Sequence, residues 1–134
     1  MSSQNINQDI EQIIRDAGNK IISEIGLGHS EMIYQKCLWH YLNKEHNFKV
    51  EIEKTYPVVF DEIQIGYCRP DLVINNTIIL EIKTTLTLSK QSKVQLQKYD
   101  KYCEIAFLVN FPPQVGTTDI ELFKQEIEIN TNLN

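Results

Sequence analysis

The sequence predicts an α+β fold in which a central mixed β-sheet, containing a β-meander and a hairpin core, is flanked by helices. The first observation is the helical spacing of apolar residues over 7–25. The second is a pair of short runs of β-forming residues within 69–83, separated by turn-forming asparagines. The third is the order strand, helix, strand between residues 78 and 111, which predicts a parallel crossover.

Length and composition set the domain count and the class of protein. With 134 residues, we expect a single domain with its core over about 7–129 and a frayed tail over 130–134. There is no apolar run long enough to cross a bilayer, and the polar, acidic start lacks the features of a signal peptide. The three cysteines, Cys37, Cys68 and Cys103, form no CxxC pair, which favours reduced packing residues. We therefore expect an intracellular protein, in the cytoplasm or associated with a nucleoid or virus.

Two helices are predicted at the N-terminal end. The first covers 7–25, where apolar residues recur at three- and four-residue steps until Gly26 ends the helix. Ser30 is a plausible N-cap for the second helix, 31–45. The inward side of that second helix is predicted to carry Tyr34, Cys37, Leu38, Tyr41 and Leu42.

Short strands follow at 48–53, 56–60 and 63–67, and they are predicted to continue into the hairpin as an antiparallel meander that ends at Lys83. A polar connector over 84–89 leads to a third helix, 90–103. The apolar run 104–111 predicts a buried strand, which Pro112 and Pro113 end. Residues 118–129 alternate loosely and predict an additional edge strand.

The loop of the central hairpin decides which side chains share a face. A two-residue loop, Asn75-Asn76, would place Glu81 opposite Pro70, whereas a three-residue loop over 75–77 pairs Asp71 with Glu81. Because side chains alternate along a strand, only the odd loop or a bulge gives consistent faces. One face then carries Leu72, Ile74, Ile78, Leu80 and Ile82, and the other carries Val73, Ile79, Asp71, Glu81 and Lys83.

Two facing carboxylates on a sheet repel each other and call for a positive charge between them. A divalent cation held by Asp71 and Glu81 would supply it, with Lys83 two residues further along the same face. The alternative is that Asp71 starts an exposed edge strand and that Glu81 and Lys83 form an ordinary solvated pair. The spacing by itself leaves both interpretations open.

Three motifs in order resemble a known family. Pro70-Asp71 followed by Glu81-Ile82-Lys83 resembles the PD-(D/E)xK signature of the restriction-endonuclease-like nuclease superfamily. The upstream segment 28–34, GHSEMIY, resembles the motif that names the GxxExxY branch. The segment 95–99, QLQKY, is similar to the Q-x3-Y element of RecB-type members. The resemblance implies a restriction-endonuclease-like fold over the whole chain.

The resemblance also implies roles for these residues. Asp71 and Glu81 would bind Mg²⁺ or Mn²⁺, with Glu31 completing the metal site, and Lys83 would orient the attacking water. Gln95 and Tyr99 would hold Lys83 or a phosphate oxygen, and Tyr34 would be a core residue whose hydroxyl has a polar partner near the site. The alternative for Glu31 is simply a favourable carboxylate at a helix N-terminus.

The expected function is therefore metal-dependent hydrolysis of nucleic acid, with DNA as the expected substrate, in repair or processing. The net charge of −5 argues against a protein that coats nucleic acid. A basic stripe on the third helix, Lys90, Lys93, Lys98 and Lys101, would contact phosphates, or be an ordinary solvated helix face. The alternative function is a catalytically silent module of nuclease fold that binds nucleic acid or a protein. In either case a homodimer or a partner protein would supply specificity.

Overall fold

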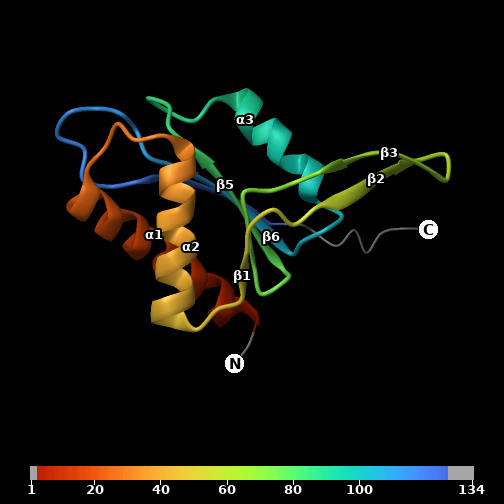
Figure 1. The fold of residues 1–134 in the computed structure, drawn as a ribbon, viewed down its shortest axis with the longest axis horizontal. Coiled ribbons are helices and arrows are strands. Elements are labelled where there is room, and N and C mark those ends of the chain that lie inside the picture. The colour runs from red at the N-terminus through yellow and green to blue at the C-terminus, as the bar shows by residue number, and fades with distance from the viewer. Residues whose placement is uncertain (1–2, 127–134) are drawn as a thin grey trace.

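The computed structural model describes residues 3–126 and shows a mixed five-stranded sheet with helices on both sides (Figure 1). The strands lie in the order β1-β4-β5-β6-β7. Only β5 and β6 are parallel, and the other neighbouring strands are antiparallel. The strand bounds are β1 Val50–Glu51, β4 Leu72–Ile74, β5 Ile78–Lys83, β6 Ile105–Asn110 and β7 Glu121–Glu126. The mixed sheet and the parallel crossover predicted from the sequence are confirmed.

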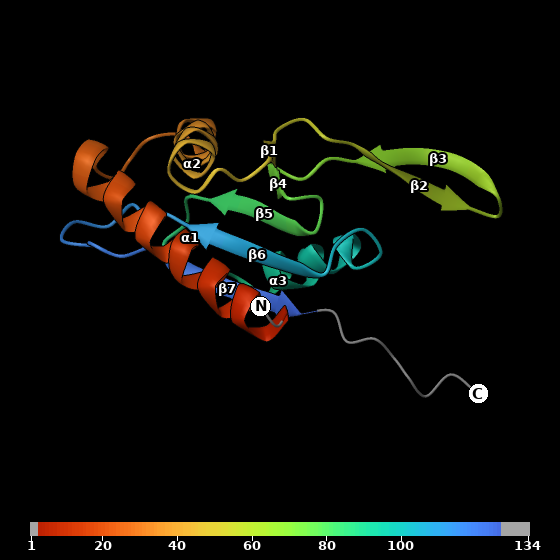
Figure 2. The same ribbon diagram turned by 90° about the horizontal axis from the view of Figure 1, so that it is seen from below.

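Two layers of helix pack on the two faces of the sheet. On one face, α1 (Ser3–Ile25) and α2 (Glu31–His46) cover side chains from β4, β5 and β6, including Leu80 and Phe107. On the other face, α3 (Lys90–Gln95) is followed by a short 3₁₀ helix, η1 (Leu96–Tyr99), which packs on Val73, Ile79 and Leu108. Figure 2 shows α1 crossing the sheet obliquely beside β6 and β7. Among the described helices, none combines the length and the apolar content that crossing a membrane requires.

The central hairpin has the predicted three-residue loop. Leu72 pairs with Leu80, Val73 with Ile79 and Ile74 with Ile78, which leaves residues 75–77 as the loop. Asn75 and Asn76 have φ values of 51° and 63°, a left-handed conformation that asparagine tolerates better than most residues. The two faces also divide as predicted, since Leu72, Ile74, Ile78, Leu80 and Ile82 lie in the core under α1 and α2.

The meander predicted for 48–83 is wrong in its middle. The first strand shortens to β1, which pairs with β4 instead of β2, and a φ of 65° at Glu53 ends it. Strands β2 (Tyr56–Phe60) and β3 (Ile63–Cys68) pair only with each other and project from the sheet as a separate hairpin (Figures 1 and 2). Its base is held by stacking of Tyr56 on Tyr102, with ring centroids 4.7 Å apart. The hairpin exposes large apolar side chains at Val58, Val59, Phe60, Ile63, Ile65 and Tyr67.

The third helix is shorter than the predicted 90–103. The α-helix ends at Gln95, and the chain tightens into η1. A 3₁₀ turn aligns side chains three residues apart, so Leu96 and Tyr99 both enter the core, each 1% exposed. The predicted edge strand within 118–129 is confirmed over β7, antiparallel to β6. The tail predicted for 130–134 lies outside the described residues.

Gly18 lets α1 approach the segment before β7. A Cβ at this position would lie 2.6 Å from Cγ2 of the buried Ile120. The next residue reinforces the contact, because the Asn19 side chain accepts the N–H of Ile120 at 3.0 Å and donates to Asp119 at 3.1 Å. The helix therefore tolerates a residue of poor helix propensity in its middle.

We predict that Gly18→Ala lowers the free energy of unfolding by about 1–3 kcal/mol, because the added methyl group overpacks the contact with Ile120. In an Ile120→Ala background the same substitution should instead stabilise, by up to about 1 kcal/mol, because only the helix propensity of alanine remains. Urea unfolding of the wild type, both single variants and the double variant measures the two effects. A stabilising Gly18→Ala in the wild-type background contradicts the prediction.

Candidate functional site

Asp71 and Glu81 are joined by reciprocal hydrogen bonds across the hairpin. The backbone N–H of Asp71 donates to Glu81 Oε1 at 2.9 Å, and the N–H of Ile82 donates to Asp71 Oδ2 at 2.7 Å. Each carboxylate therefore bonds the backbone of the opposite chain segment, at the position just before β4 begins. This exchange continues the pairing of the two strands by one step and fixes both carboxylates side by side. It leaves one oxygen of each carboxylate, Asp71 Oδ1 and Glu81 Oε2, without a hydrogen bond among the described residues.

Burial makes this pair electrostatically unfavourable when both groups are ionised. Loss of solvent raises the pKa of Asp71 above its usual value, an effect that the N–H of Ile82 and the charge of Lys83 oppose. Burial, and then the charge of Asp71, raise the pKa of Glu81 to about 7, against the hydrogen bonds from Asp71 and Tyr99. When both carboxyl groups are ionised, the surrounding protein groups therefore compensate their negative charge only in part.

Tyr99 is the third member of this arrangement. Its hydroxyl donates to Glu81 Oε1 at 3.0 Å, and its ring is buried in the core. Burial, and then the charge of Glu81, raise the pKa of Tyr99, so the hydroxyl stays protonated and remains a donor at neutral pH. The family resemblance implies that Tyr99 holds Lys83 or a phosphate oxygen, whereas in the structure its hydroxyl holds the carboxylate of Glu81.

A small hollow of about 40 Å³ lies beside the pair. Its walls include Glu81, Lys83, Gln95, Lys98 and Tyr99. Lys83 is half-buried at the end of β5, and among the described residues it forms no ion pair with Asp71 or Glu81. The structure therefore brings Asp71, Glu81, Lys83, Gln95 and Tyr99 together, as the sequence motifs predicted.

Glu31 is not in contact with the carboxylate pair. Its side chain is exposed in the first turn of α2, and no group of three acidic, histidine or cysteine side chains within the described residues is placed to hold a metal ion. Its neighbour one turn later, Gln35, does reach the site, because Nε2 of Gln35 donates to the backbone oxygen of Asp71 at 2.8 Å. Residues four apart share a helix face, so Glu31 lies on the side of α2 that faces the hairpin. Its role as a ligand stays a prediction.

Tyr34 supports the fold next to the site. Its hydroxyl donates to the backbone oxygen of Gly26 at 2.9 Å and accepts the N–H of His29 at 3.3 Å. Its ring stacks on Phe111, with centroids 4.1 Å apart and planes 5° from parallel. The tyrosine of the 28–34 motif therefore fixes the turn that starts α2. The predicted polar partner for its hydroxyl exists, and it is this turn.

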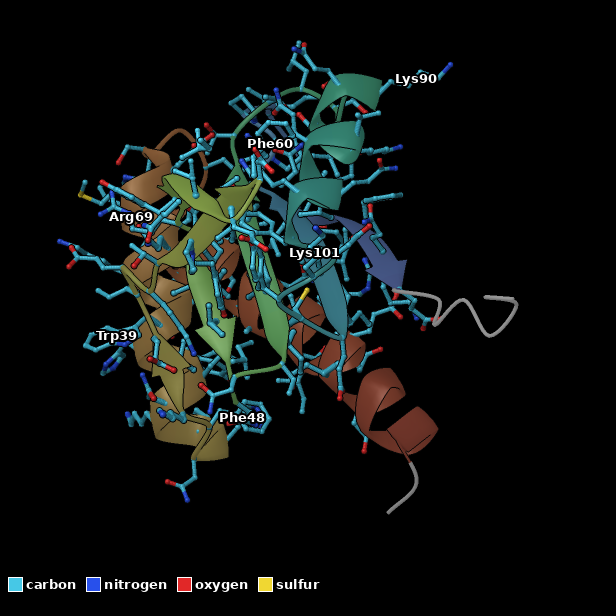
Figure 3. The ribbon with its side chains drawn as sticks, turned by 90° about the vertical axis from the view of Figure 1, so that its right-hand side faces the viewer. Trp39, Phe48, Phe60, Arg69, Lys90 and Lys101 are labelled. Atoms are coloured by element: carbon cyan, nitrogen blue, oxygen red, sulfur yellow. The ribbon has the colours of Figure 1, made fainter. Side chains whose placement is uncertain are left out.

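The four lysines predicted to form one basic stripe have different surroundings. Lys93 lies over the ring of Phe123 at 5.1 Å, and Lys98 lies over the ring of Tyr99 at 5.1 Å, beside the hollow. Lys90 and Lys101 are exposed at opposite ends of the segment (Figure 3). The four lysines do not lie on one continuous α-helix, because the α-helix ends at Gln95, and their contact with nucleic acid stays a prediction. Lys98 is the member next to the site.

Sequence reasoning missed the residues that brace the chain beyond Lys83. Asn110 is fully buried in β6, where its side chain donates to Thr85 O at 2.8 Å and to Glu121 Oε1 at 2.9 Å and accepts the N–H of Thr85 at 2.9 Å. The carbonyl of Lys83 accepts the N–H of Phe111 at 2.9 Å. The one available signal was an asparagine inside an otherwise apolar strand, which needs buried partners. Gln35 carried no signal of its own.

The comparisons with known proteins show the family and the fold. The model of the PD-(D/E)XK nuclease superfamily matches residues 8–123, and the chain belongs to that superfamily. The crystal structure of SSO0001 is similar to this chain with a TM-score of 0.50 and 18% sequence identity, over 90% of this chain and 68% of that one. At that identity the likeness supports the fold alone. Among curated protein sequences, none matches the chain.

We predict that the metal-free protein loses stability as the pH rises from about 4.5 to about 7. The folded state binds the Glu81 proton more tightly than the unfolded state does, so folding is favoured below this window and the loss is complete above it. The expected loss is on the order of 2–3 kcal/mol. Glu81→Gln should remove most of this dependence and should be more stable than the wild type at about pH 8.

Urea unfolding in EDTA at several pH values measures this effect. The matched control is Glu104→Gln, which changes an exposed carboxylate just before β6. Its stability should follow the wild-type pH dependence. A wild-type stability that rises between these pH values would mean that Glu81 is ionised throughout.

Proposed function

We propose that the protein is a metal-dependent nuclease that hydrolyses phosphodiester bonds, with DNA as the expected substrate. The observation that carries this proposal is the pair of hydrogen-bonded, buried carboxylates of Asp71 and Glu81, with Lys83 beside the same hollow. Paired carboxylates with a lysine at one end of a strand suit phosphoryl chemistry, because they combine a cation site with a positive charge for the phosphate. Membership of the PD-(D/E)XK superfamily supports the same assignment.

The carboxylate pair fits Mg²⁺ or Mn²⁺. Each carboxylate has one oxygen bonded to a protein donor and one available, so the pair offers two oxygen ligands side by side. Mg²⁺ usually keeps several waters and takes one or two carboxylates, so the pair suffices without a third protein ligand. The raised pKa values of both groups fit a site that gains charge balance when a cation binds. A bound cation would supply Lewis-acid chemistry by activating water and neutralising charge on the phosphate.

The protein's own residues have distinct tasks in this proposal. Tyr99 and the N–H of Asp71 hold one oxygen of Glu81, so the other oxygen keeps a fixed direction. Gln35 holds the backbone of Asp71 from the side of α2. Lys83 orients the attacking water and stabilises the negative charge that develops on the phosphate. Gln95 lines the same hollow, where it would contact a phosphate oxygen.

The motif around α2 supports assignment to the GxxExxY branch of the superfamily. Gly28 has a φ of 100°, which a side-chain-bearing residue rarely adopts, and Tyr34 fixes the same turn through Gly26 and His29. The conformation of this turn thus explains why a glycine and a tyrosine stand at these two positions of the motif. Glu31 lies between them at the start of α2, where it would join the metal site only if substrate or cation draws it toward Asp71.

We predict that Asp71→Ala and Glu81→Ala each abolish Mn²⁺ binding and nuclease activity, because each removes an oxygen ligand. Lys83→Ala should bind Mn²⁺ normally while activity falls by about 10²–10³-fold, because its charge acts on the transition state. Titration calorimetry measures metal binding, and cleavage of single-stranded, duplex and branched DNA measures activity. Glu104→Ala is the control and should match the wild type in both. Normal cleavage by Lys83→Ala would falsify its assigned role.

Substrate binding should depend on Lys98 more than on the rest of the basic segment. We predict that Lys98→Gln weakens DNA binding and lowers the slope of log K against log salt by about 0.7 for single strands or about 0.9 for duplex. Lys93→Gln should change the slope less, because Lys98 lines the hollow beside Glu81 and Lys93 does not. Binding is measured by fluorescence anisotropy at several salt concentrations. Lys20→Gln, an exposed lysine of α1, is the control, and an equal slope for Lys98→Gln and the control would exclude the contact.

A second candidate function is a catalytically silent module that binds a partner. The observation that favours it is the projecting β2–β3 hairpin, whose exposed apolar residues include Phe60, at 74% exposed. Exposed apolar patches of this kind mark protein interfaces, so a second copy of this chain or a partner protein would bind here and supply specificity. The calorimetric titration separates the two candidates, because a module without catalysis has no reason to bind Mn²⁺ at Asp71 and Glu81 of the β4–β5 hairpin.

A further inference from the structure

A second cavity lies at the end of the molecule opposite the β2–β3 hairpin. It has a volume of about 540 Å³ and lies between the loop after α1 and the loop that connects β6 to β7. Both loops lie at the same end of the molecule, near the C-terminal ends of β5 and β6 (Figure 1). Its volume is within the range of small-molecule binding sites, about 300–1,000 Å³. Neither Asp71, Glu81 nor any lysine lines it, so the candidate active site gives it no role.

The lining has a distinctive chemical character. None of the side chains that line the cavity, as the structure describes it, carries a charge. The cavity is open to solvent. Its apolar surface comes from Ile22, Leu27, Pro113 and the fully exposed Val115, while Gln114 and two threonines add neutral polar groups. A phosphate would find no cation in this cavity, so the lining suits a neutral ligand with an apolar surface and polar edges.

Glycines keep the cavity open and its backbone accessible. Gly26, Gly28 and Gly116 all line it, all have positive φ, and a Cβ on any of them would meet no atom within 4 Å. The internal hydrogen bonds of the two loops use the N–H groups of Gly26, Gln114 and Thr117. Other peptide groups of the lining, Leu27 and Gly28 among them, are therefore available within the described chain to bond the edge of a ligand.

The cavity is close to the candidate active site. The carbonyl of Lys83 accepts the N–H of Phe111 at 2.9 Å, and Pro113, two residues later, forms part of the cavity wall. Phe111 also stacks on Tyr34, whose hydroxyl donates to the backbone oxygen of Gly26, another residue of the cavity wall. At about 3.3–3.6 Å of chain per residue, the wall lies on the order of 10 Å from Lys83. This separation is a nucleotide or two along a strand.

We propose that this cavity binds one unpaired nucleobase of the substrate strand, next to the phosphate held by Lys83 and Lys98. A base has the required chemistry: it is neutral, its faces are apolar, and its edges carry donors and acceptors for backbone and amide groups. A base seated in this open cavity must be unstacked and unpaired. The protein therefore acts on single-stranded or locally unpaired nucleic acid in preference to continuous duplex. The inference rests on the proposed nuclease function and adds the class of substrate.

The test compares cavity-filling variants with substrates that lack a base. Ser23, on the surface of α1, and Thr117 both line the cavity, so Ser23→Trp and Thr117→Trp fill it from opposite walls. Thr55→Trp is the matched control at an exposed position away from the cavity. All three are made in the Lys83→Ala background with Mg²⁺, where cleavage is expected to be about 10²–10³-fold slower, so that binding is measured before the oligonucleotide is cleaved and each variant is compared with this parent. The ligands are short single-stranded oligonucleotides, each with one abasic residue at a different position.

At one position, the abasic residue should weaken binding by the Lys83→Ala protein about tenfold, the loss expected when the contacts of one bound base are removed. Ser23→Trp and Thr117→Trp should bind the intact oligonucleotide about tenfold more weakly and lose nothing further when that base is absent. Thr55→Trp should behave as its parent does. In the Lys83-containing protein, Ser23→Trp should raise KM for single-stranded substrate with kcat nearly unchanged. Thermal unfolding of each variant checks that the fold is kept.

The outcomes separate this inference from the proposed function. If the wild type cleaves nucleic acid but no abasic position weakens binding, the cavity does not take a base, and an apolar peptide side chain becomes the better occupant. Equal losses on intact and abasic oligonucleotides would likewise overturn the proposal, because the tryptophans would then act by a general effect. If the wild type neither binds nor cleaves any of these substrates, the nuclease assignment itself fails, and the base site fails with it.

Discussion

The exchange of hydrogen bonds between Asp71 and Glu81 is the constraint on which the rest of the site depends. Each carboxylate bonds a backbone N–H at the other's strand, at 2.9 Å and 2.7 Å, so neither can move without the other. The exchange requires the register that the 75–77 loop sets, and Asn75 holds that loop by accepting the N–H of Lys49 at 3.0 Å. A slip of one residue would place the carboxylates on opposite faces, because side chains alternate along a strand.

The same arrangement works against stability. Burial raises the pKa of both carboxyl groups, so in the absence of a cation their ionised forms make folding less favourable at neutral pH. The surrounding structure compensates with rigid supports: Tyr99 from η1, Gln35 from α2, and the buried Asn110 network behind Lys83. Strain at a functional site that a well-packed scaffold holds in place is a common property of enzymes.

One face of the sheet carries the larger apolar core, and the other face carries the candidate active site. Under α1 and α2 the core is large and apolar, and Tyr34 stacks there on Phe111 while its hydroxyl fixes the turn before α2. On the other face, the short α3–η1 segment delivers Tyr99 and Lys98 to the carboxylates. The cavity proposed to bind a base is lined by the end of α1, the loop after it and the loop between β6 and β7, beyond the C-terminal ends of β5 and β6. A substrate strand that reaches from this cavity to Lys98 would contact both parts.

The sequence by itself determined the local features: the helices at either side of Gly26, the odd hairpin loop, the shared face of Asp71, Glu81 and Lys83, and the parallel crossover to β6. The helices, the loop and the shared face follow from side-chain periodicity and turn residues, which act over a few neighbouring positions. The crossover follows from the order strand, helix, strand, since such connections are nearly always parallel and right-handed. Only the tertiary structure decided that β1 pairs with β4 while β2 and β3 project, that the third helix tightens after Gln95, and that Gln35 and Asn110 brace the site. Each of these depends on contacts between segments far apart in the chain, as when Leu96 and Tyr99 pack under Val73 and Leu108, and local periodicity contains no information about such partners.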